Sequence, residues 1–365
     1  MNNIPVANPK IGVDEAQAVY EVIMSGWVSM GPKVQHFEQL LADYAGSKYA
    51  VAMNNGTSTL HACLLALDIG ERDEVIVPTL SYISSANTIL YQNATPVFCD
   101  SDPDLFNATV EHVRAKISPR TKAIMTVDMK GLPVDYEAFA ELSAETGIPI
   151  ISDSAESFGA LYKGKKIGTQ ALLHSFSFFA NKNLTTGEGG VVLTDDAGLY
   201  EKLRIIRNQG QEGRYHHTLL GNNFRMTDVQ AAIGIEQLKK LDKIIGEKAK
   251  IAKQYDEIFG VTGSVSSPKM PTYSCNPSWY LYSIKVDAKL RGELIEHLSC
   301  KGIETRLSFP PIHAQPLYRK LFDAKDSEFP GAMRAFDEFL DIPIWFGMSE
   351  KQVNTVSSEI LAVIK

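Results

Sequence analysis

The sequence predicts an α/β fold, with a mostly parallel sheet in a large domain (residues 1–245) and a smaller α+β domain (residues 246–365). Three observations support this. Short β-rich runs alternate with helical patterns in the first half, one long helical pattern begins at Asp228, and shorter elements follow it. Alternation of this kind indicates crossover units, whose strands are parallel and buried on both faces.

The alternating region contains five strand-like runs and four helical patterns. The strands are predicted at 50–53, 75–77, 95–99, 122–127 and 148–152, and the helices at 57–67, 81–92, 110–117 and 136–145. Ligands of such sheets bind at the carboxyl ends of the strands. We therefore expect the loops after Met53, Val77, Val127 and Ser152 to surround one site.

The second half begins with apolar residues at helical spacing from Asp228 to about Phe259. A helix of this length often bridges domains, so the domain boundary is placed near Ile245. Beyond it, 280–286 alternates like a strand and 291–298 has a helical pattern.

Composition excludes several classes of protein. With 365 residues, 44% hydrophobic and 22% charged, the chain is typical of a globular enzyme, and its net charge of −7 argues against nucleic-acid binding. The N-terminus lacks a signal-peptide pattern and no apolar run approaches a membrane span. The cysteines are far apart and form no Cys-x-x-Cys pair, so no metal site is expected and a cytoplasmic location is predicted; they are Cys63, Cys99, Cys275 and Cys300.

Three polar segments are candidates for chemistry. Asn54–Thr59 joins a strand to a helix, where a glycine turn and free N–H groups suit a phosphate, although Ser and Thr also serve as plain helix caps. Asp153 follows a buried strand and can hold a proton on the ring nitrogen of a heterocycle, or can simply cap a helix. Lys182 lies between a β-like run and a glycine turn. If desolvated, its pKa would fall and it could act as a nucleophile; otherwise it is a surface lysine.

These segments occur in the order found in a known family. The chain resembles the DegT/DnrJ/EryC1/StrS sugar aminotransferases, and is most similar to the perosamine-synthase-like branch, which aminates nucleotide-linked 4-keto-6-deoxy sugars. The resemblance covers nearly the whole chain, and the Lys182 segment is its most specific part. The matching segments are 25–29, 55–57, 73–78 with Tyr82, 118–124, 151–156, 176–190, 223–228, 302–306 and His313.

The resemblance implies a pyridoxal 5'-phosphate (PLP) enzyme of the aspartate-aminotransferase fold, fold type I. Lys182 would bind PLP covalently and then serve as acid and base, and Asp153 would keep the ring nitrogen protonated so that the ring acts as an electron sink. Glu156 would contact the hydroxyl side of the ring, where the family often has Gln. Tyr82 would stack on the ring face, although without the resemblance it would be a core aromatic.

The resemblance also places the phosphate and the substrate. Gly56, Thr57 and Ser177 would cradle the phosphate. Asn223 would reach the phosphate of the partner subunit's cofactor, which implies a homodimer with shared sites. Arg306 and His313 match positions at or near the sugar; the alternative for both is surface charge on the small domain.

Two features of the sequence bear on the place of this chain within the family. Where relatives commonly have His-x-Tyr-Gly, it has Asp128-Met129-Lys130-Gly131, in a loop expected to face the site. The dehydratase branch has His in place of the cofactor lysine, whereas Lys182 is present here.

The leading hypothesis is therefore amino transfer, with L-glutamate as donor and a nucleotide-linked 4-keto-6-deoxyhexose as acceptor. A second hypothesis keeps the cofactor but changes the acceptor to a cyclitol or a keto-sugar without a nucleotide. A third is a non-catalytic PLP-binding sensor, against which the intact Lys182 and Asp153 argue.

Overall fold

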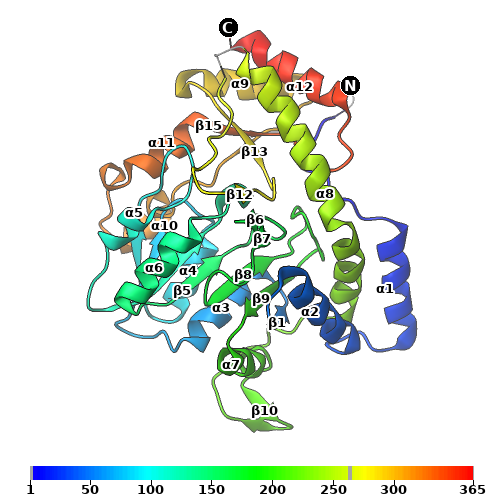
Figure 1. Cartoon of the computed structure of the whole chain (residues 1–365), viewed down its shortest axis with the longest axis vertical. Helices are drawn as coiled ribbons and strands as arrows, with labels where there is room; N and C mark the ends of the chain where they lie inside the picture. Colours follow the sequence, from blue (N-terminus) through cyan, green and yellow to red (C-terminus); the bar gives the residue numbers. More distant parts are fainter. Residues whose placement is uncertain (1–2, 262–264, 365) are drawn as a thin grey trace.

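A seven-stranded sheet forms the centre of the computed structural model, which describes residues 3–261 and 265–364 (Figure 1). Six strands run in one direction and β9 runs against them, so the predicted mostly parallel sheet is confirmed. In spatial order the strands are β1 (Tyr49–Met53), β9 (Gly190–Thr194), β8 (Leu173–Ser177), β5 (Ile150–Asp153), β4 (Thr121–Val127), β2 (Glu74–Pro78) and β3 (Thr95–Cys99).

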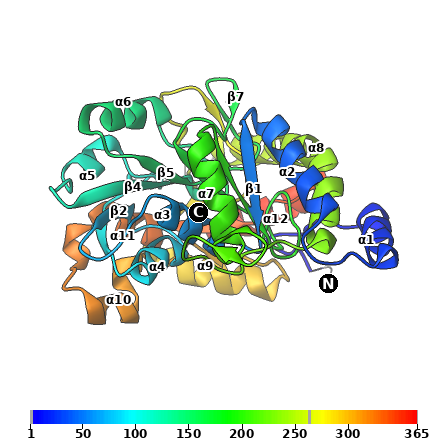
Figure 2. The same ribbon diagram turned by 90° about the horizontal axis from the view of Figure 1, so that it is seen from below.

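Helices cover both faces of this sheet, as Figure 2 shows from below. One face packs on α3 (Gly56–Ala66), α4 (Ser84–Tyr91) and α7 (Ala197–Arg207). The other packs on α2 (Pro32–Ala45), α5 (Val110–Arg114), α6 (Tyr136–Thr146) and the start of α8 (Asp228–Gly260). Successive strand residues face opposite sides, so Val51 and Met53 belong to the first core and Ala50 and Ala52 to the second. A sheet buried on both faces explains the nearly continuous apolar runs of its strands.

The long helix α8 has 33 residues and links this core to a third one. It begins at a capping box, in which the Thr227 and Gln230 side chains satisfy each other's backbone N–H groups. Its last turns carry Tyr255 and Phe259 into the third core. The proposed boundary near residue 245 falls inside this continuous helix, and the division into two domains stays a prediction.

The third core lies under a small antiparallel sheet and the C-terminal helices. The sheet has the order β13 (Tyr282–Lys285), β15 (Phe339–Ile342) and β14 (Arg306–Leu307). Helices α9 (Ala288–Cys300) and α12 (Glu350–Val363) contribute to this core, whereas α10 (Pro316–Leu321) and α11 (Pro330–Glu338) contribute to the first core. The remaining elements are α1 (Val13–Ser25), the sheet β12 (Cys275–Asn276), β6 (Leu161–Tyr162) and β7 (Lys165–Lys166), and the hairpin β10 (Gln211–Gly213) and β11 (His216–His217). No helix among the described residues is both long and apolar enough to cross a membrane.

One predicted boundary differs in a way that matters for the site. The helix expected from residue 81 begins only at Ser84, so Ser81 and Tyr82 lie in the loop after β2. The first helical turn therefore does not bury Tyr82, whose side chain remains 55% exposed.

His174 in β8 is a buried histidine whose neutral form the fold requires. Its Nε2 accepts the N–H groups of Gln170 and Ala171, and its Nδ1 pairs with the Ser154 hydroxyl at 3.0 Å. Burial lowers the pKa of His174 from 6.5 to about 3. The folded-state pKa is thus below the unfolded one, so this stabilisation is present above pH 6.5 and is lost as the pH falls toward 3.

We expect His174→Gln to weaken the dependence of stability on pH, because glutamine can accept the same N–H groups without titrating. Between pH 7 and pH 5 the free energy of unfolding should fall by about 2 kcal/mol more in the wild type than in the variant. Urea unfolding at both pH values measures this difference. Equal losses in the two proteins would contradict the assignment.

Candidate active site

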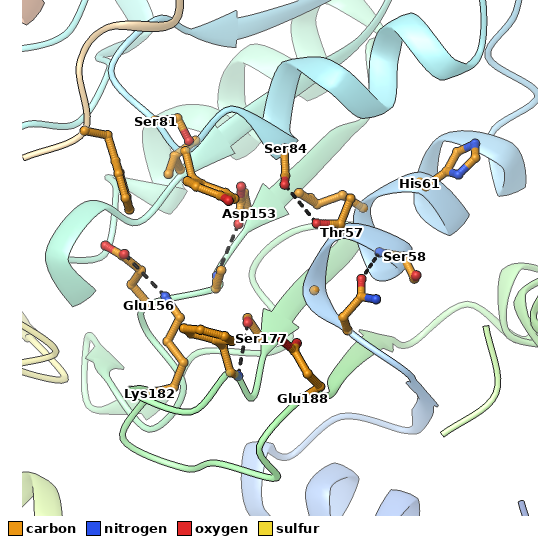
Figure 3. A pocket seen from close by; sticks show the side chains of 18 of the residues that line it. Thr57, Ser58, His61, Ser81, Ser84, Asp153, Glu156, Ser177, Lys182 and Glu188 are labelled. Atoms are coloured by element: carbon orange, nitrogen blue, oxygen red, sulfur yellow. Dashed lines mark hydrogen bonds and ion pairs between the residues drawn. The ribbon is translucent and has the colours of Figure 1, made fainter. Parts of the chain in front are cut away.

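A cavity of about 640 Å³ opens at the carboxyl ends of the central strands (Figure 3). The loops after β1, β2, β4 and β5 all contribute to its wall, which confirms that the loops after Met53, Val77, Val127 and Ser152 surround one site. The segment after β8 adds Lys182. Of the residues predicted for the site, eight line the cavity: Gly56, Thr57, Tyr82, Asp153, Glu156, Ser177, Lys182 and Arg306.

Lys182 extends into the cavity from the loop after β8. Its Nζ lies 3.3 Å from Oε1 of Glu156 and 4.0 Å from the centre of the Tyr280 ring, and only 12% of its side chain is exposed. The lowered pKa expected for a desolvated lysine is wrong for this structure. Burial does act to lower the pKa of Lys182, but Tyr280, Glu156 and Asp153 together outweigh it and raise the pKa. The direction of the pKa shift is therefore decided by neighbours that lie far from Lys182 in sequence but close to it in space, and not by burial.

Asp153 is the last residue of β5 and lies 5% exposed at the cavity wall. Its Oδ2 accepts the Ser85 hydroxyl at 2.7 Å, and its Oδ1 accepts only a long 3.3 Å bond from the Ala155 N–H. Burial raises the pKa of Asp153, and the Ser85 bond opposes that rise. A buried carboxylate with a weakly used oxygen suits a protonated ring nitrogen, whose positive charge would compensate the desolvation.

The start of α3 forms a cradle for an anion. Asn55 is the N-cap, and its side chain accepts the Ser58 N–H at 2.8 Å, so the cap and the anion site occur together. Gly56 and Thr57 fall in the first turn, where N–H groups have no partner inside the helix. A Cβ on Gly56 would lie 2.8 Å from the Ser177 Cβ, so glycine is what lets the helix start approach the end of β8. These features fit the phosphate of PLP.

Gly56→Ala should therefore weaken PLP binding without unfolding the protein. The added methyl group must displace Ser177 or the helix start, and we expect the Kd for PLP to rise about tenfold, roughly 1.4 kcal/mol. Fluorescence titration of the protein freed of PLP measures this affinity. Gly70→Ala is the matched control, because no atom lies within 4 Å of its added Cβ. Equal affinity in the two variants would exclude the cradle.

Glu156 and Tyr82 complete the wall around Lys182. Besides its contact with Lys182, Glu156 accepts the Lys130 backbone N–H through Oε2 at 2.7 Å. Tyr82 is a loop residue rather than a core aromatic, and its ring centre lies 5.2 Å from that of Phe309. Both therefore lie where a flat ring near Lys182 would meet them.

The loop at residues 128–131 faces the cavity through only one of its side chains. Met129 lines the cavity, but the side chains of its neighbours Asp128 and Lys130 do not. Asp128 accepts bonds from Val134, Tyr136 and Ser157. The Lys130 ammonium reaches away from the cavity, toward the small sheet, where it meets Ser283, Ser308 and Asp341 at 2.6–2.7 Å. The loop therefore faces the cavity through Met129, as expected, while the side chains of Asp128 and Lys130, which depart from the family pattern, bond elsewhere in the protein.

Arg306, His313 and Asn223 were predicted for the substrate and the partner subunit, and the structure places each of them in a different environment. Arg306 lines the cavity between the rings of Tyr280 and Phe309, at 5.6 and 5.9 Å. His313 is fully buried away from the cavity, with Nδ1 2.6 Å from the Thr79 hydroxyl and Nε2 3.2 Å from Asp326. Asn223 is exposed outside the cavity of its own chain, in the segment before α8.

Several lining residues were not predicted from the sequence. They come from α3, the start of α4, the loops after β2 and β8, the segment before α8 and the segments next to β13 and β14: His61, Ser81, Ser84, Phe179, Asn181, Glu188, Phe224, Tyr280 and Phe309. Asn181 and Glu188 flank the Lys182 motif, so their closeness in sequence was an available signal. Tyr280 and Phe309 are reached only through tertiary packing, and no local pattern marks them.

The fold and this cavity define the class: an α/β enzyme whose site fits PLP, with a lysine and a carboxylate opening into one cavity. Comparison with known proteins identifies the family. The model of the DegT/DnrJ/EryC1/StrS aminotransferase family matches residues 9–361, and the chain belongs to this family. It is accordingly a PLP-dependent sugar aminotransferase.

Individual relatives match over nearly their full length. GDP-perosamine synthase of Caulobacter vibrioides is 38% identical, with 99% of this chain and 98% of the relative covered. The spore coat polysaccharide biosynthesis protein SpsC of Bacillus subtilis is 35% identical, with 99% and 97% covered. Among solved structures, Helicobacter pylori PseC, an aminotransferase in pseudoaminic acid biosynthesis, has a TM-score of 0.94 at 28% identity, with 100% and 99% covered. The PLP form of a putative sugar aminotransferase from Streptococcus pneumoniae has a TM-score of 0.92 at 27% identity, with 100% of both chains covered.

Proposed function

We propose that this protein transfers an amino group from L-glutamate to the keto group of a nucleotide-linked 4-keto-6-deoxyhexose. The observation that carries the proposal is the convergence of Lys182, Asp153 and the α3 cradle on one cavity. The relatives named GDP-perosamine synthase support a nucleotide-linked sugar as acceptor.

Each end of the cavity has a role in holding PLP. Gly56 and Thr57 in the first turn of α3, together with Ser177 at the end of β8, would hold the phosphate through N–H and O–H donors. Asp153 would accept a hydrogen bond from the protonated ring nitrogen, and Tyr82 and Glu156 would contact the ring face and its hydroxyl side. When bound, PLP supplies an electrophilic carbon and an electron sink.

Side chains of the protein would transfer the protons of the reaction and stabilise its charges. The Lys182 amine, once free, would take the proton from the α carbon of the amino donor and would deliver it to the electrophilic carbon that PLP supplies, and the reverse transfer would serve the keto-sugar. Glu156, at 3.3 Å, keeps this amine directed into the cavity and stabilises its charged form. Arg306 contributes a positive charge at the wall, which favours an anionic substrate such as a sugar nucleotide or the donor carboxylate.

The assembly and location follow as proposals. Asn223 is exposed outside its own cavity, as is required if it serves the partner subunit's cofactor, so we propose a homodimer with shared sites. Exposed apolar residues such as Trp27, Met24 and Leu220 provide surface for such an interface. The four cysteines are unpaired, which suits the reducing cytoplasm.

Absorbance spectroscopy combined with an acceptor panel tests the function. Adding L-glutamate to the PLP-loaded protein should convert the cofactor to its pyridoxamine form, and a keto-sugar acceptor should convert it back. The panel should contain keto-sugars with and without a nucleotide, and cyclitol ketones. Conversion back only by acceptors that lack a nucleotide would favour the second hypothesis. Absence of any conversion with several amino donors would revive the sensor hypothesis.

A further inference from the structure

Lys248, in the middle of α8, is a buried cation that the proposed mechanism does not use. Only 5% of it is exposed, and its Nζ donates to the Asn183 side-chain oxygen at 2.8 Å and to the Tyr280 carbonyl at 3.0 Å. In the part of the chain that the structure describes, it forms no ion pair with a carboxylate. A buried ammonium without a counter-charge is costly to keep, so its presence calls for a physical reason.

The two acceptors of Lys248 belong to residues next to Lys182, one in sequence and one in space. Asn183 is the next residue after Lys182, and its side-chain N–H₂ donates to the Ser278 carbonyl at 2.7 Å. Tyr280 places its ring 4.0 Å from the Lys182 Nζ, while its hydroxyl donates to the Asn181 side chain at 3.0 Å. Lys248 therefore closes a ring of contacts that joins both neighbours of Lys182 to the segment at residues 278–280.

Charge as well as geometry connects Lys248 to Lys182. Burial, together with the positive charges of Arg306 and Lys182, lowers the pKa of Lys248 to about 7. The repulsion is mutual, so the Lys248 charge opposes protonation at the Lys182 nitrogen. It acts against Glu156 and Asp153, which favour that protonation.

We propose that Lys248 is a positioning residue for amino transfer, whose ammonium fixes the Lys182 loop against Tyr280 and offsets part of the negative charge that surrounds the Lys182 amine. The inference rests on the proposed function, because it requires Lys182 to be the residue that binds PLP. A merely structural lysine would need only the two hydrogen bonds; a positioning residue also needs the charge.

The experiment compares Lys248→Met, Lys248→Arg and the control Lys250→Met in the PLP-loaded protein. Lys250 is an exposed lysine two residues further along the same helix. The visible absorption of each protein is titrated against pH, and its midpoint reports protonation at the Lys182 nitrogen. For Lys248→Met we expect the midpoint to rise by roughly one pH unit. We also expect kcat to fall by up to about 100-fold, with KM for the donor nearly unchanged. Lys248→Arg should keep the wild-type midpoint, and Lys250→Met should match the wild type in both measurements.

The outcomes separate this inference from the proposed function. A wild-type protein loaded with PLP that shows no visible absorption of lysine-bound cofactor would overturn both. A normal wild type with an unchanged midpoint in Lys248→Met would overturn the inference alone. If Lys248→Met fails to fold, Lys248→Gln decides, because glutamine can still donate hydrogen bonds but carries no charge: a raised midpoint with a fall in kcat supports the positioning role, and a wild-type midpoint refutes it.

Discussion

Lys182→Ala is expected to lower kcat for amino transfer by about 10⁴-fold or more, because one substitution removes both the nucleophile and the acid–base group. The amine lies next to Glu156 and Tyr280 in the cavity, and among the described residues no second lysine lines this cavity. Borohydride treatment should attach PLP permanently to the wild type and leave the variant free of label, as measured by mass spectrometry of the intact protein.

Lys165→Ala is the matched control for this substitution, since Lys165 is an exposed lysine in β7. It should keep both the label and the activity. Labelling of the Lys182→Ala variant at another lysine, with activity retained, would show that a different residue binds the cofactor.

Asp341→Asn should produce the largest loss of stability, about 3–5 kcal/mol in the free energy of unfolding. Asp341 is fully buried and lies 2.6 Å from the equally buried Lys130 ammonium, with Arg306 3.6 Å away on its other oxygen. Removing its charge leaves two cations without their shared carboxylate. Urea unfolding at pH 7 measures the loss.

Two further variants serve as controls for the interpretation of this result. The double variant Lys130→Met with Asp341→Leu should recover most of the stability, because it removes both fully buried charges and leaves only the partly exposed Arg306 without this carboxylate. Glu137→Gln breaks the exposed ion pair with Lys163 and should cost less than about 1 kcal/mol. A loss in Asp341→Asn no larger than in Glu137→Gln would mean that the buried cluster does not stabilise the fold.

Much of the fold was predictable because its signals are local. The five predicted strands and the long helix from Asp228 are present, since alternating apolar runs and helical periodicity act within a few residues. The start of α4 was predicted three residues too early, because the polar run at Ser81 resembles a helix start and only the packing of Tyr82 at the cavity excludes it.

The site residues that lie at or just after the end of a strand could be predicted from the sequence. Asp153, Gly56 and Ser177 lie at or just beyond the carboxyl ends of their strands, and the topology alone brings such positions together. The direction of a side chain is not set in this way. Lys130 has a left-handed backbone, with φ of 59°, and points toward the small sheet, while His313 turns into a buried contact with Thr79.

The sequence by itself determined the fold class, the order of the strand-end segments and the lysine proposed to bind PLP, because periodicity and motif order are properties of neighbouring residues. Only the tertiary structure decided which charges surround that lysine. Glu156, Tyr280 and Lys248 lie far from Lys182 along the chain. They come from the loop after β5, the segment before β13 and the helix α8, and only the fold brings them near it. Electrostatic interactions depend on distance in space, so the raised pKa of Lys182 could not be read from its neighbours in sequence.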